Sequence, residues 1–224
     1  MPEKFSEFEH GSKEIEGVEI SKDKESFVEK EALGDLQDLG LDWQDLKDKL
    51  TLDIGAGRAL IAEAAKKKGV DVISFDINPE MWIEKGVKLP DASYVKGSAE
   101  QLPFPDEKFD LIISHAGPFT NTYSKEGFIQ MLSEAKRVLK EGGEIRFGPG
   151  NLNADIFMDK ELFSAEEYES FTTKQRIERI GERSLEFLKS IDKNIVQQPI
   201  KEPSHDFPSS NFYALKKLTV PKRK

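Results

Sequence analysis

Hydrophobic and polar residues follow two different periods along the middle of the chain, one typical of strands and one of helices. Short apolar runs bounded by turn residues predict buried strands, because a strand covered on both faces carries apolar side chains at most positions. The predicted strands are residues 50–54, 71–76, 92–97, 109–115 and 144–150. Helical periodicity lies between them, at residues 59–68, 78–86 and 125–143. This alternation predicts a parallel sheet with helices on both faces.

Local signals mark where these helices begin and end. Asn78 and Pro79 are typical of a helix start, where an Asn side chain caps free amides and Pro fits the first turn. Gly69 is typical of a helix end. We expect the long helix that starts at residue 125 to end at Gly142 and Gly143.

The pattern changes on both sides of the alternating region. A helical pattern runs from residue 24 to 38 and is followed by a short helix near residues 42–47. Residues 161–191 are also mostly helical in pattern. Two late apolar stretches, 194–200 and 210–218, predict strands that form an antiparallel hairpin at one edge of the sheet.

Charge and composition suggest how the chain is divided. A chain of 224 residues with 37% hydrophobic and 33% charged residues suits one α/β domain with additions. The first 50 residues hold 15 Asp and Glu against 7 Lys, so they carry −8 of the net charge of −9. We expect residues 1–48 to form an acidic helical cap or arm, 49–220 the main domain with a helical insertion at 151–191, and 221–224 a basic tail. The start of the cap fits a disordered arm or a lid over a site.

Several classes of chemistry and partner are disfavoured by the sequence. The absence of cysteine excludes disulfides, thiolate metal ligands and a cysteine nucleophile. No spacing of His, Asp and Glu suggests a metal site, and no basic stripe suggests a nucleic-acid partner. The chain shows neither an apolar run long enough to span a membrane nor a secretion signal. We therefore expect a cytoplasmic monomer or homodimer that needs no metal.

Candidate ligand-binding residues lie in the loops after the predicted strands, because open parallel sheets bind ligands at these ends. Asp53 ends the first strand, and Gly55 and Gly57 follow in a turn that lets a ligand approach the backbone. A dinucleotide-binding loop would carry a third glycine at the position of Leu60. The Asp53 carboxylate would repel a pyrophosphate and attract an amino-bearing ligand. The loop therefore favours a cationic nucleoside over NAD.

Two further strand ends carry polar residues. Asp76 ends the second strand, where a carboxylate can accept hydrogen bonds from both ribose hydroxyls of a nucleoside. Ile77 follows and could pack on adenine. His115 ends the fourth strand and is one of three histidines in the chain. It is a candidate general base, since its ordinary pKa lies near neutrality, or it forms part of the pocket wall.

Four blocks of sequence resemble the class I S-adenosylmethionine-dependent methyltransferases, in particular their small-molecule branch. The blocks are LDIGAGRA, SFDINPEM, GSAEQLPFPDEKFDLIIS and EAKRVLKEGGEIRF, which come in family order within residues 50–148. NFYALKKL resembles the last strand of the family. The resemblance implies a Rossmann-like, doubly wound seven-stranded sheet, mostly parallel with the last strand antiparallel. It also implies S-adenosylmethionine as cofactor and S-adenosylhomocysteine as product.

The resemblance implies roles for individual residues. The glycine loop would hold the methionine part of the cofactor, Asp76 the ribose and Ile77 the adenine. The expected cofactor-binding residues are Asp53, Gly55, Ala56, Gly57, Asp76, Ile77, Ser98, Ala99, Glu100, Ser114 and His115. Phe119 and Tyr123 are candidates for the acceptor pocket, and His115 is the candidate catalytic residue.

Two positions depart from the family pattern. Ala59 stands where many relatives have glycine, and Ser98 stands where relatives often have aspartate. These departures leave room for a non-catalytic protein that binds S-adenosylmethionine or a nucleoside. We predict a methyltransferase acting on a small molecule, with that binding protein and an NAD(P)-dependent Rossmann oxidoreductase as the alternatives.

Overall fold

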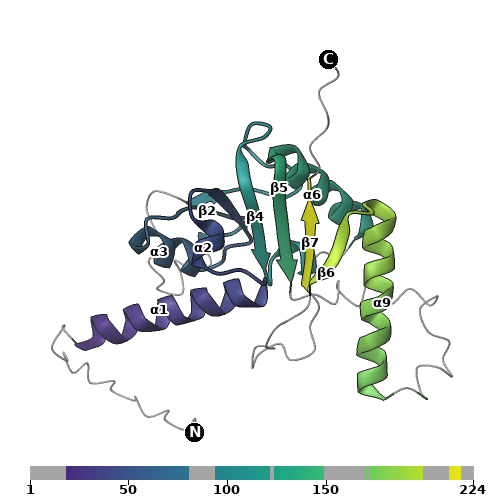
Figure 1. The fold of residues 1–224 in the computed structure, drawn as a ribbon, viewed down its shortest axis with the longest axis horizontal. Helices are drawn as coiled ribbons and strands as arrows, with labels where there is room; N and C mark the ends of the chain where they lie inside the picture. Colours follow the sequence, from purple (N-terminus) through teal and green to yellow (C-terminus); the bar gives the residue numbers. More distant parts are fainter. Residues whose placement is uncertain are drawn as a thin grey trace, which may run out of the picture.

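A sheet of seven strands forms the centre of the molecule (Figure 1). The computed structural model describes residues 19–80, 94–121, 124–148, 170, 172–198 and 212–217. The strands are β1 (Leu50–Ile54), β2 (Asp71–Asp76), β3 (Tyr94–Lys96), β4 (Phe109–His115), β5 (Leu139–Gly148), β6 (Ile195–Gln198) and β7 (Phe212–Lys216). Strands β1 to β5 pair in parallel, and β7 runs antiparallel to both of its neighbours, β5 and β6. The predicted fold class is confirmed.

The order of the strands creates a reversal point in the sheet. Across the sheet the strands follow the order β3-β2-β1-β4-β5-β7-β6. The chain therefore builds outward from β1 to β3 on one side, and then crosses back to place β4 and β5 on the other. The carboxyl ends of β1 and β4 lie side by side at this reversal, which is where doubly wound sheets bind their ligands.

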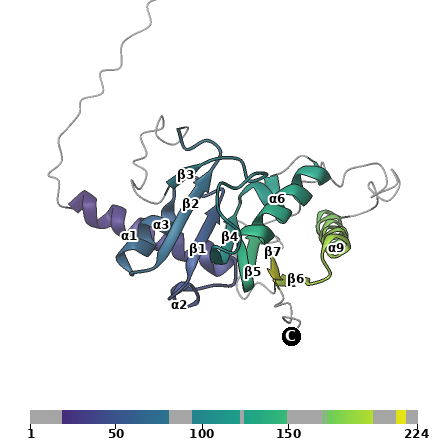
Figure 2. The same ribbon diagram turned by 90° about the horizontal axis from the view of Figure 1, so that it is seen from above.

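Helices cover both faces of the sheet. One layer holds α1 (Glu19–Asp38), α2 (Trp43–Leu46) and α3 (Leu60–Lys67), and the other holds α5 (Pro118–Asn121), α6 (Lys125–Val138) and α9 (Thr173–Ile191). Figure 2 shows α1 and α3 on one side of the strands and α6 on the other. Side chains of β4 alternate between the two layers, since Leu111 and Ile113 pack with α1 and α3 whereas Ile112 packs with α6.

The acidic segment before β1 contributes a helix to one of these layers. Helix α1 begins earlier than predicted, at Glu19, and packs along α3 and against β4. Its buried side chains include Val28, Ala32 and Leu36. The described part of the segment thus shares a core with the sheet, and the proposed division of the chain at residue 48 stays a prediction.

The boundary between α6 and β5 differs from the prediction. The helix ends at Val138, and Leu139 already pairs with Phe109 of β4. The expected continuation of the helix to Gly142 was wrong, because sheet pairing of Leu139 outweighs the local helical pattern. The ladder then shifts register and resumes where Leu111 pairs with Glu144, while the amide of Gly142 donates to the carbonyl of Lys217.

Some predicted elements fall outside the described residues. These are most of the helix at 78–86, the first part of the insertion at 151–191, and the tail at 221–224. The described helix of the insertion, α9, buries Leu188 in the core beside the sheet. None of the helices in the described residues is both long enough and apolar enough to cross a membrane.

Candidate functional site

A pocket of about 670 Å³ lies at the carboxyl ends of β1, β2 and β4, where the strand order reverses. Its walls come from the glycine loop after β1, the turn after β2, the loop after β3, and the segment from β4 into α6. Pockets of about 300–1,000 Å³ hold small ligands and cofactors in other proteins. The pocket is therefore large enough for an organic ligand of cofactor size.

Most of the predicted cofactor-binding residues meet at this pocket. Those that line it are Gly55, Gly57, Asp76, Ile77, Ser98, Ala99 and Glu100. Ala56, Asp53, Ser114 and His115 lie next to the lining segments but are not among the lining residues. The structure thus gathers residues from three separate loops into one place, as the strand-end argument expected.

The two candidates for the acceptor pocket have different outcomes. Phe119 is fully buried, and its ring packs against those of Phe128 and Phe147 at centroid distances of 5.9 and 5.3 Å. The expectation that Phe119 lines a substrate pocket is therefore corrected, since the side chain belongs to the core. Tyr123 lies outside the described residues.

The glycine loop touches the segment after β4 through backbone atoms. Gly55 has a φ of +79°, and a Cβ there would lie 2.5 Å from Cδ of Pro118 and 2.8 Å from Cα of Gly117. A Cβ on Gly117 would collide with Oγ of Ser114 and with the carbonyl oxygen of Ile54. Both positions therefore require glycine, and their contact shapes one wall of the pocket.

Asp76 and Tyr94 hold the glycine loop from the neighbouring strands. The Asp76 carboxylate accepts from the amides of Gly57 at 3.0 Å and Asn78 at 2.9 Å, and the Tyr94 hydroxyl donates to the carbonyl of Gly57 at 2.9 Å. A carboxylate has about four acceptor positions. Asp76 therefore keeps capacity to accept hydrogen bonds from a ligand while it fixes the loop.

Asp53 lies buried beneath the glycine loop, with 4% of its surface exposed. Burial raises the pKa of its carboxyl to about 7, and the negative charge of Asp35 adds to the rise, whereas the charge of His115 opposes it. A ligand cation nearby would favour the ionised form. The predicted contact of Asp53 with the ligand stays a prediction, because Asp53 is not among the residues that line the pocket.

The ring of His115 lies between two carboxylates of α1. Its Nδ1 is 3.2 Å from Oδ1 of Asp35, and its Nε2 is 3.1 Å from Oδ2 of Asp38. Burial lowers the pKa of His115, but the hydrogen bond with Asp38 and the charges of Asp35, Asp38 and Asp53 outweigh it and raise the pKa overall. An imidazolium can donate to both carboxylates at once. Figure 1 shows the resulting junction, where the end of α1 meets the end of β4.

Strand geometry explains why His115 faces α1. Along β4 the side chains of Leu111 and Ile113 point to the layer of α1 and α3, and His115 continues this alternation. Ser114 points the other way, is fully buried, and donates its hydroxyl to the carbonyl of Ile54 at 2.8 Å. Ser114 therefore joins the ends of β4 and β1, and its predicted contact with the cofactor stays a prediction.

Several lining residues were missed by the sequence analysis. They include Gly117, Pro118, Asn121 and Ser124 from the segment between β4 and α6, and Met131 from α6 itself. The sequence offered one signal for them, a glycine two residues after a strand end. Met131 carried no such signal, because it lines the pocket only through the packing of α6 on the sheet.

Comparisons with known proteins agree with this geometry. A family model described as a methyltransferase domain matches residues 52–147. The demethylmenaquinone methyltransferase of Chlorobaculum tepidum is 34% identical over 93 residues, which make up 41% of this chain and 37% of that protein. The chain therefore spans less than half the length of this curated relative.

Two solved structures share the fold. Human N-acetylserotonin methyltransferase in complex with S-adenosylmethionine aligns with a TM-score of 0.52 and 16% identity, over 88% of this chain and 56% of that chain. An S-adenosylmethionine-dependent methyltransferase of Archaeoglobus fulgidus aligns with a TM-score of 0.51 and 15% identity, over 88% of this chain and 98% of that one. The family match includes the glycine loop and most of strands β1 to β5, so this region of the chain is similar to methyltransferase domains, and the two solved structures share its fold.

Proposed function

We propose that the chain transfers the methyl group of S-adenosylmethionine to a small organic acceptor. The observation that carries the proposal is the pocket itself. It brings the glycine loop, Asp76 and the segment 98–100 together at the reversal point of the sheet. The relatives support the reaction class, and the acceptor is open to experiment.

The residues of the pocket fit this cofactor. Asp76 has acceptor capacity for the ribose hydroxyls, and Ile77, with 67% of its surface exposed beside the pocket, offers an apolar face to adenine. The backbone of Gly55 and Gly57 would follow the methionine part, and the buried carboxylate of Asp53 suits its ammonium group. The donor set thus favours a cationic nucleoside over a dinucleotide, whose pyrophosphate would meet Asp53.

The edge of the adenine would meet the loop after β3. Ser98, Ala99 and Glu100 line this wall, and the Ser98 hydroxyl accepts from the amide of Glu100 at 3.3 Å. Ser98 therefore also shapes the turn that follows it.

When bound, S-adenosylmethionine would supply an electrophilic methyl carbon: an electron pair of the acceptor forms the new bond, and the electrons of the broken carbon–sulfur bond return to sulfur. The chain contributes alignment and the exclusion of water, which account for much of the acceleration of such reactions. His115 keeps both ring nitrogens against carboxylates. We therefore assign His115 to charge balance beside Asp53, and the proton of the acceptor leaves to solvent.

A small acceptor is supported by the lining and by the relatives. Pro118 and Met131 give the pocket apolar surface next to the glycine loop. The similar protein of Chlorobaculum tepidum is named for a small molecule, demethylmenaquinone. A cytoplasmic location, a monomeric or homodimeric state and the lack of a nucleic-acid partner stay predictions from the sequence.

The proposal is tested in two steps. Isothermal titration calorimetry should detect binding of S-adenosylhomocysteine, and a metabolite extract incubated with a labelled methyl donor should yield a labelled small molecule. Binding without transfer to any extract component would favour the non-catalytic alternative. Tight binding of NAD(H) with no affinity for S-adenosylhomocysteine would replace the proposal with the oxidoreductase.

A further inference from the structure

Three polar side chains on one face of α6 bind the loop that follows β3. They are Gln130, Glu134 and Arg137, spaced four and three residues apart and therefore aligned along the helix. Each of them hydrogen-bonds to the backbone of residues 100–104. One face of α6 thus forms hydrogen bonds along the whole length of a non-helical loop.

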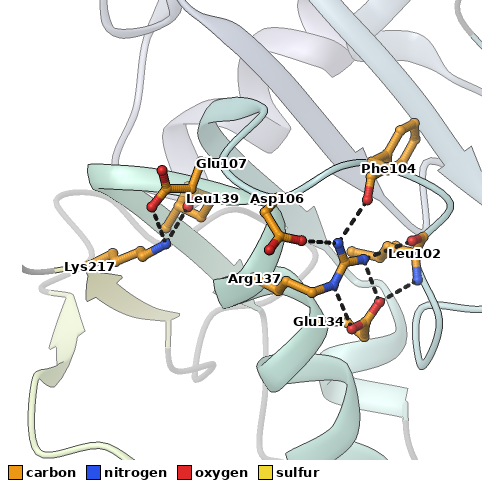
Figure 3. Close-up of polar contacts among 8 residues, drawn as sticks. All are labelled: Leu102, Phe104, Asp106, Glu107, Glu134, Arg137, Leu139 and Lys217. Carbon is orange, nitrogen blue, oxygen red and sulfur yellow. Dashed lines mark hydrogen bonds and ion pairs between the residues drawn. The ribbon is translucent and has the colours of Figure 1, made fainter.

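Glu134 and Arg137 together hold both backbone groups of Leu102 (Figure 3). The Leu102 amide donates to Oε2 of Glu134 at 2.9 Å, and Nη2 of Arg137 donates to the Leu102 carbonyl at 2.9 Å. The two side chains also bind each other, through Nε to Oε1 at 2.9 Å and Nη2 to Oε2 at 2.8 Å. This bidentate pair orients both side chains toward the loop.

Further hydrogen bonds from α6 hold the loop on both sides of Leu102. Nη1 of Arg137 donates to the carbonyl of Phe104 at 2.9 Å and to Oδ1 of Asp106 at 2.8 Å. Nε2 of Gln130 donates to the carbonyl of Glu100 at 3.1 Å. Leu102 and Phe104 bury their side chains in the core, so the loop is fixed from both sides.

The held segment continues directly into the pocket wall. Ser98, Ala99 and Glu100 line the pocket, and Glu100 is only two residues from Leu102. Gly97 precedes them and packs closely on Phe75, since a Cβ there would lie 2.8 Å from the ring. The position of this wall therefore depends on the contacts with α6.

Ionisation keeps these contacts intact at neutral pH. The hydrogen bond with Arg137 lowers the pKa of Glu134, and its hydrogen bond from the Leu102 amide acts in the same direction although partial burial opposes both. The hydrogen bonds to Glu134 and Asp106 raise the pKa of Arg137. Both groups therefore stay charged while the pocket is in use.

We propose that Glu134 and Arg137 are positioning residues for cofactor binding. By binding the backbone of Leu102, they fix the position of the pocket wall formed by Ser98, Ala99 and Glu100. The inference rests on the proposed function, because it assigns this wall to the adenosine half of S-adenosylmethionine. Small displacements of a wall that contacts a ligand are costly to affinity, since each hydrogen bond depends on distance and direction.

The test compares two variants of the same helix. Arg137→Gln removes the charge that holds Leu102 and Phe104, whereas Lys136→Gln removes an ion pair of 2.6 Å with Asp192 on the side of α9 and β6. Calorimetry well below the unfolding midpoint should show a Kd for S-adenosylhomocysteine raised about tenfold in Arg137→Gln, because hydrogen bonds to charged groups contribute on this scale. Adenosine alone should lose affinity by a similar factor. Lys136→Gln should bind both ligands like the wild type.

Conservative variants separate positioning from stability. Arg137→Lys keeps the charge but cannot bridge Glu134 and two carbonyls, so its Kd should fall between those of wild type and Arg137→Gln. If Arg137→Gln does not fold, Glu134→Gln, which keeps a hydrogen-bonding side chain, should still raise the Kd, and amide hydrogen exchange at residues 98–104 should rise with it.

The outcomes are distinct. A wild-type protein that binds neither ligand would contradict the proposed function and this inference with it. A wild-type protein that binds, with an unchanged Kd in folded Arg137→Gln or Glu134→Gln, would overturn the inference alone. An equal loss of affinity in Lys136→Gln would also overturn it, since the effect would then be a general consequence of a weakened helix.

Discussion

The pocket is flanked by two polar networks that differ in what they join. On the α1 side, the His115 ring bridges the carboxylates of Asp35 and Asp38. On the α6 side, Glu134 and Arg137 bind mainly to backbone groups of a loop. The first network joins three ionisable side chains to one another, whereas the second joins an ion pair to backbone amides and carbonyls.

This difference separates two kinds of control over one pocket. The α1 side lies beside Asp53, whose pKa of about 7 places its ionisation in the neutral range. The pKa values of Glu134 and Arg137 are shifted away from neutrality. We therefore expect pH to act on the pocket through the α1 side, while the α6 side sets its shape at every pH near neutrality.

The largest expected effect comes from Asp53→Asn. Loss of the carboxylate should raise the Kd for S-adenosylhomocysteine by about 10- to 100-fold, the range expected for a buried hydrogen bond between charged groups. At pH 8 the free variant should be at least as stable as the wild type, because a carboxyl with a raised pKa opposes folding once it ionises. Calorimetry and thermal unfolding measure the two effects. Asp71→Asn, at an exposed position where β2 begins, is the control, and equal affinity in both variants would contradict the prediction.

The second-largest effect is expected in the dependence of binding affinity on pH. If the ionised form of Asp53 binds the ammonium group, affinity for S-adenosylhomocysteine should rise about fivefold from pH 6 to pH 7, as expected for a group with a pKa of about 7. Arg137→Gln should bind more weakly at each pH but keep this slope. A wild-type affinity that does not change with pH would contradict the assignment of Asp53 as the titrating group. A changed slope in Arg137→Gln would contradict the claim that pH acts on the pocket through the α1 side alone.

His115→Gln should lower the stability of the fold moderately, and more at low pH than at high pH. The raised pKa of His115 means that its charge stabilises the fold below about pH 6.5 and that this contribution is lost as the pH rises through the folded-state value. The variant should therefore lose about 1–2 kcal/mol of unfolding free energy at pH 6 and less at pH 9, measured by urea unfolding.

The same variant tests the role of His115 in catalysis. Loss of its charge should raise the pKa of Asp53 further and move the midpoint of the binding profile to higher pH. Turnover at saturating cofactor should change little. A large fall in turnover with unchanged affinity would instead identify His115 as a general base.

The smallest effect is expected for Gln130→Ala. This exposed side chain gives one hydrogen bond to the carbonyl of Glu100, at the end of the held loop. Its removal should raise the Kd for S-adenosylhomocysteine by about twofold, because a single exposed neutral hydrogen bond contributes little. Titration calorimetry at pH 6 and pH 8 should give the same ratio to wild type. A ratio that varies with pH would assign part of the α6 side to the titrating network.

Much of the fold could be predicted because the buried strands have clear local limits. The predicted bounds of β1, β2 and β4 agree with the structure, since each strand is apolar and ends at residues with another role, such as Asp76 or His115. The end of α6 could not be predicted in this way. Pairing of Leu139 with Phe109 is a contact across the fold, and it overrides a helical pattern that continues for several residues.

The candidate site was predictable where a residue follows a strand directly. Asp76 ends a strand, Gly55 and Ser98 follow strands, and all three line the pocket. Phe119 also comes soon after a strand, yet it lies in the short helix α5 and its ring is buried in the core rather than exposed to the pocket. Contacts from α6, such as that of Arg137 with Leu102, depend on helix packing that no local pattern records.

The contact between Gly55 and Gly117 has a consequence for the redesign of this pocket. A library that varies residue 117 would consist mostly of chains in which the new side chain collides with Ser114 and with the backbone of Ile54. Changes that alter the proposed acceptor range are better sought at Met131, which lines the same pocket from α6, than at Asn121, whose amide and side chain both donate to the carbonyl of Gly117. The two glycines are thus fixed by their mutual contact, and substitutions that vary the pocket have to be made at other lining positions.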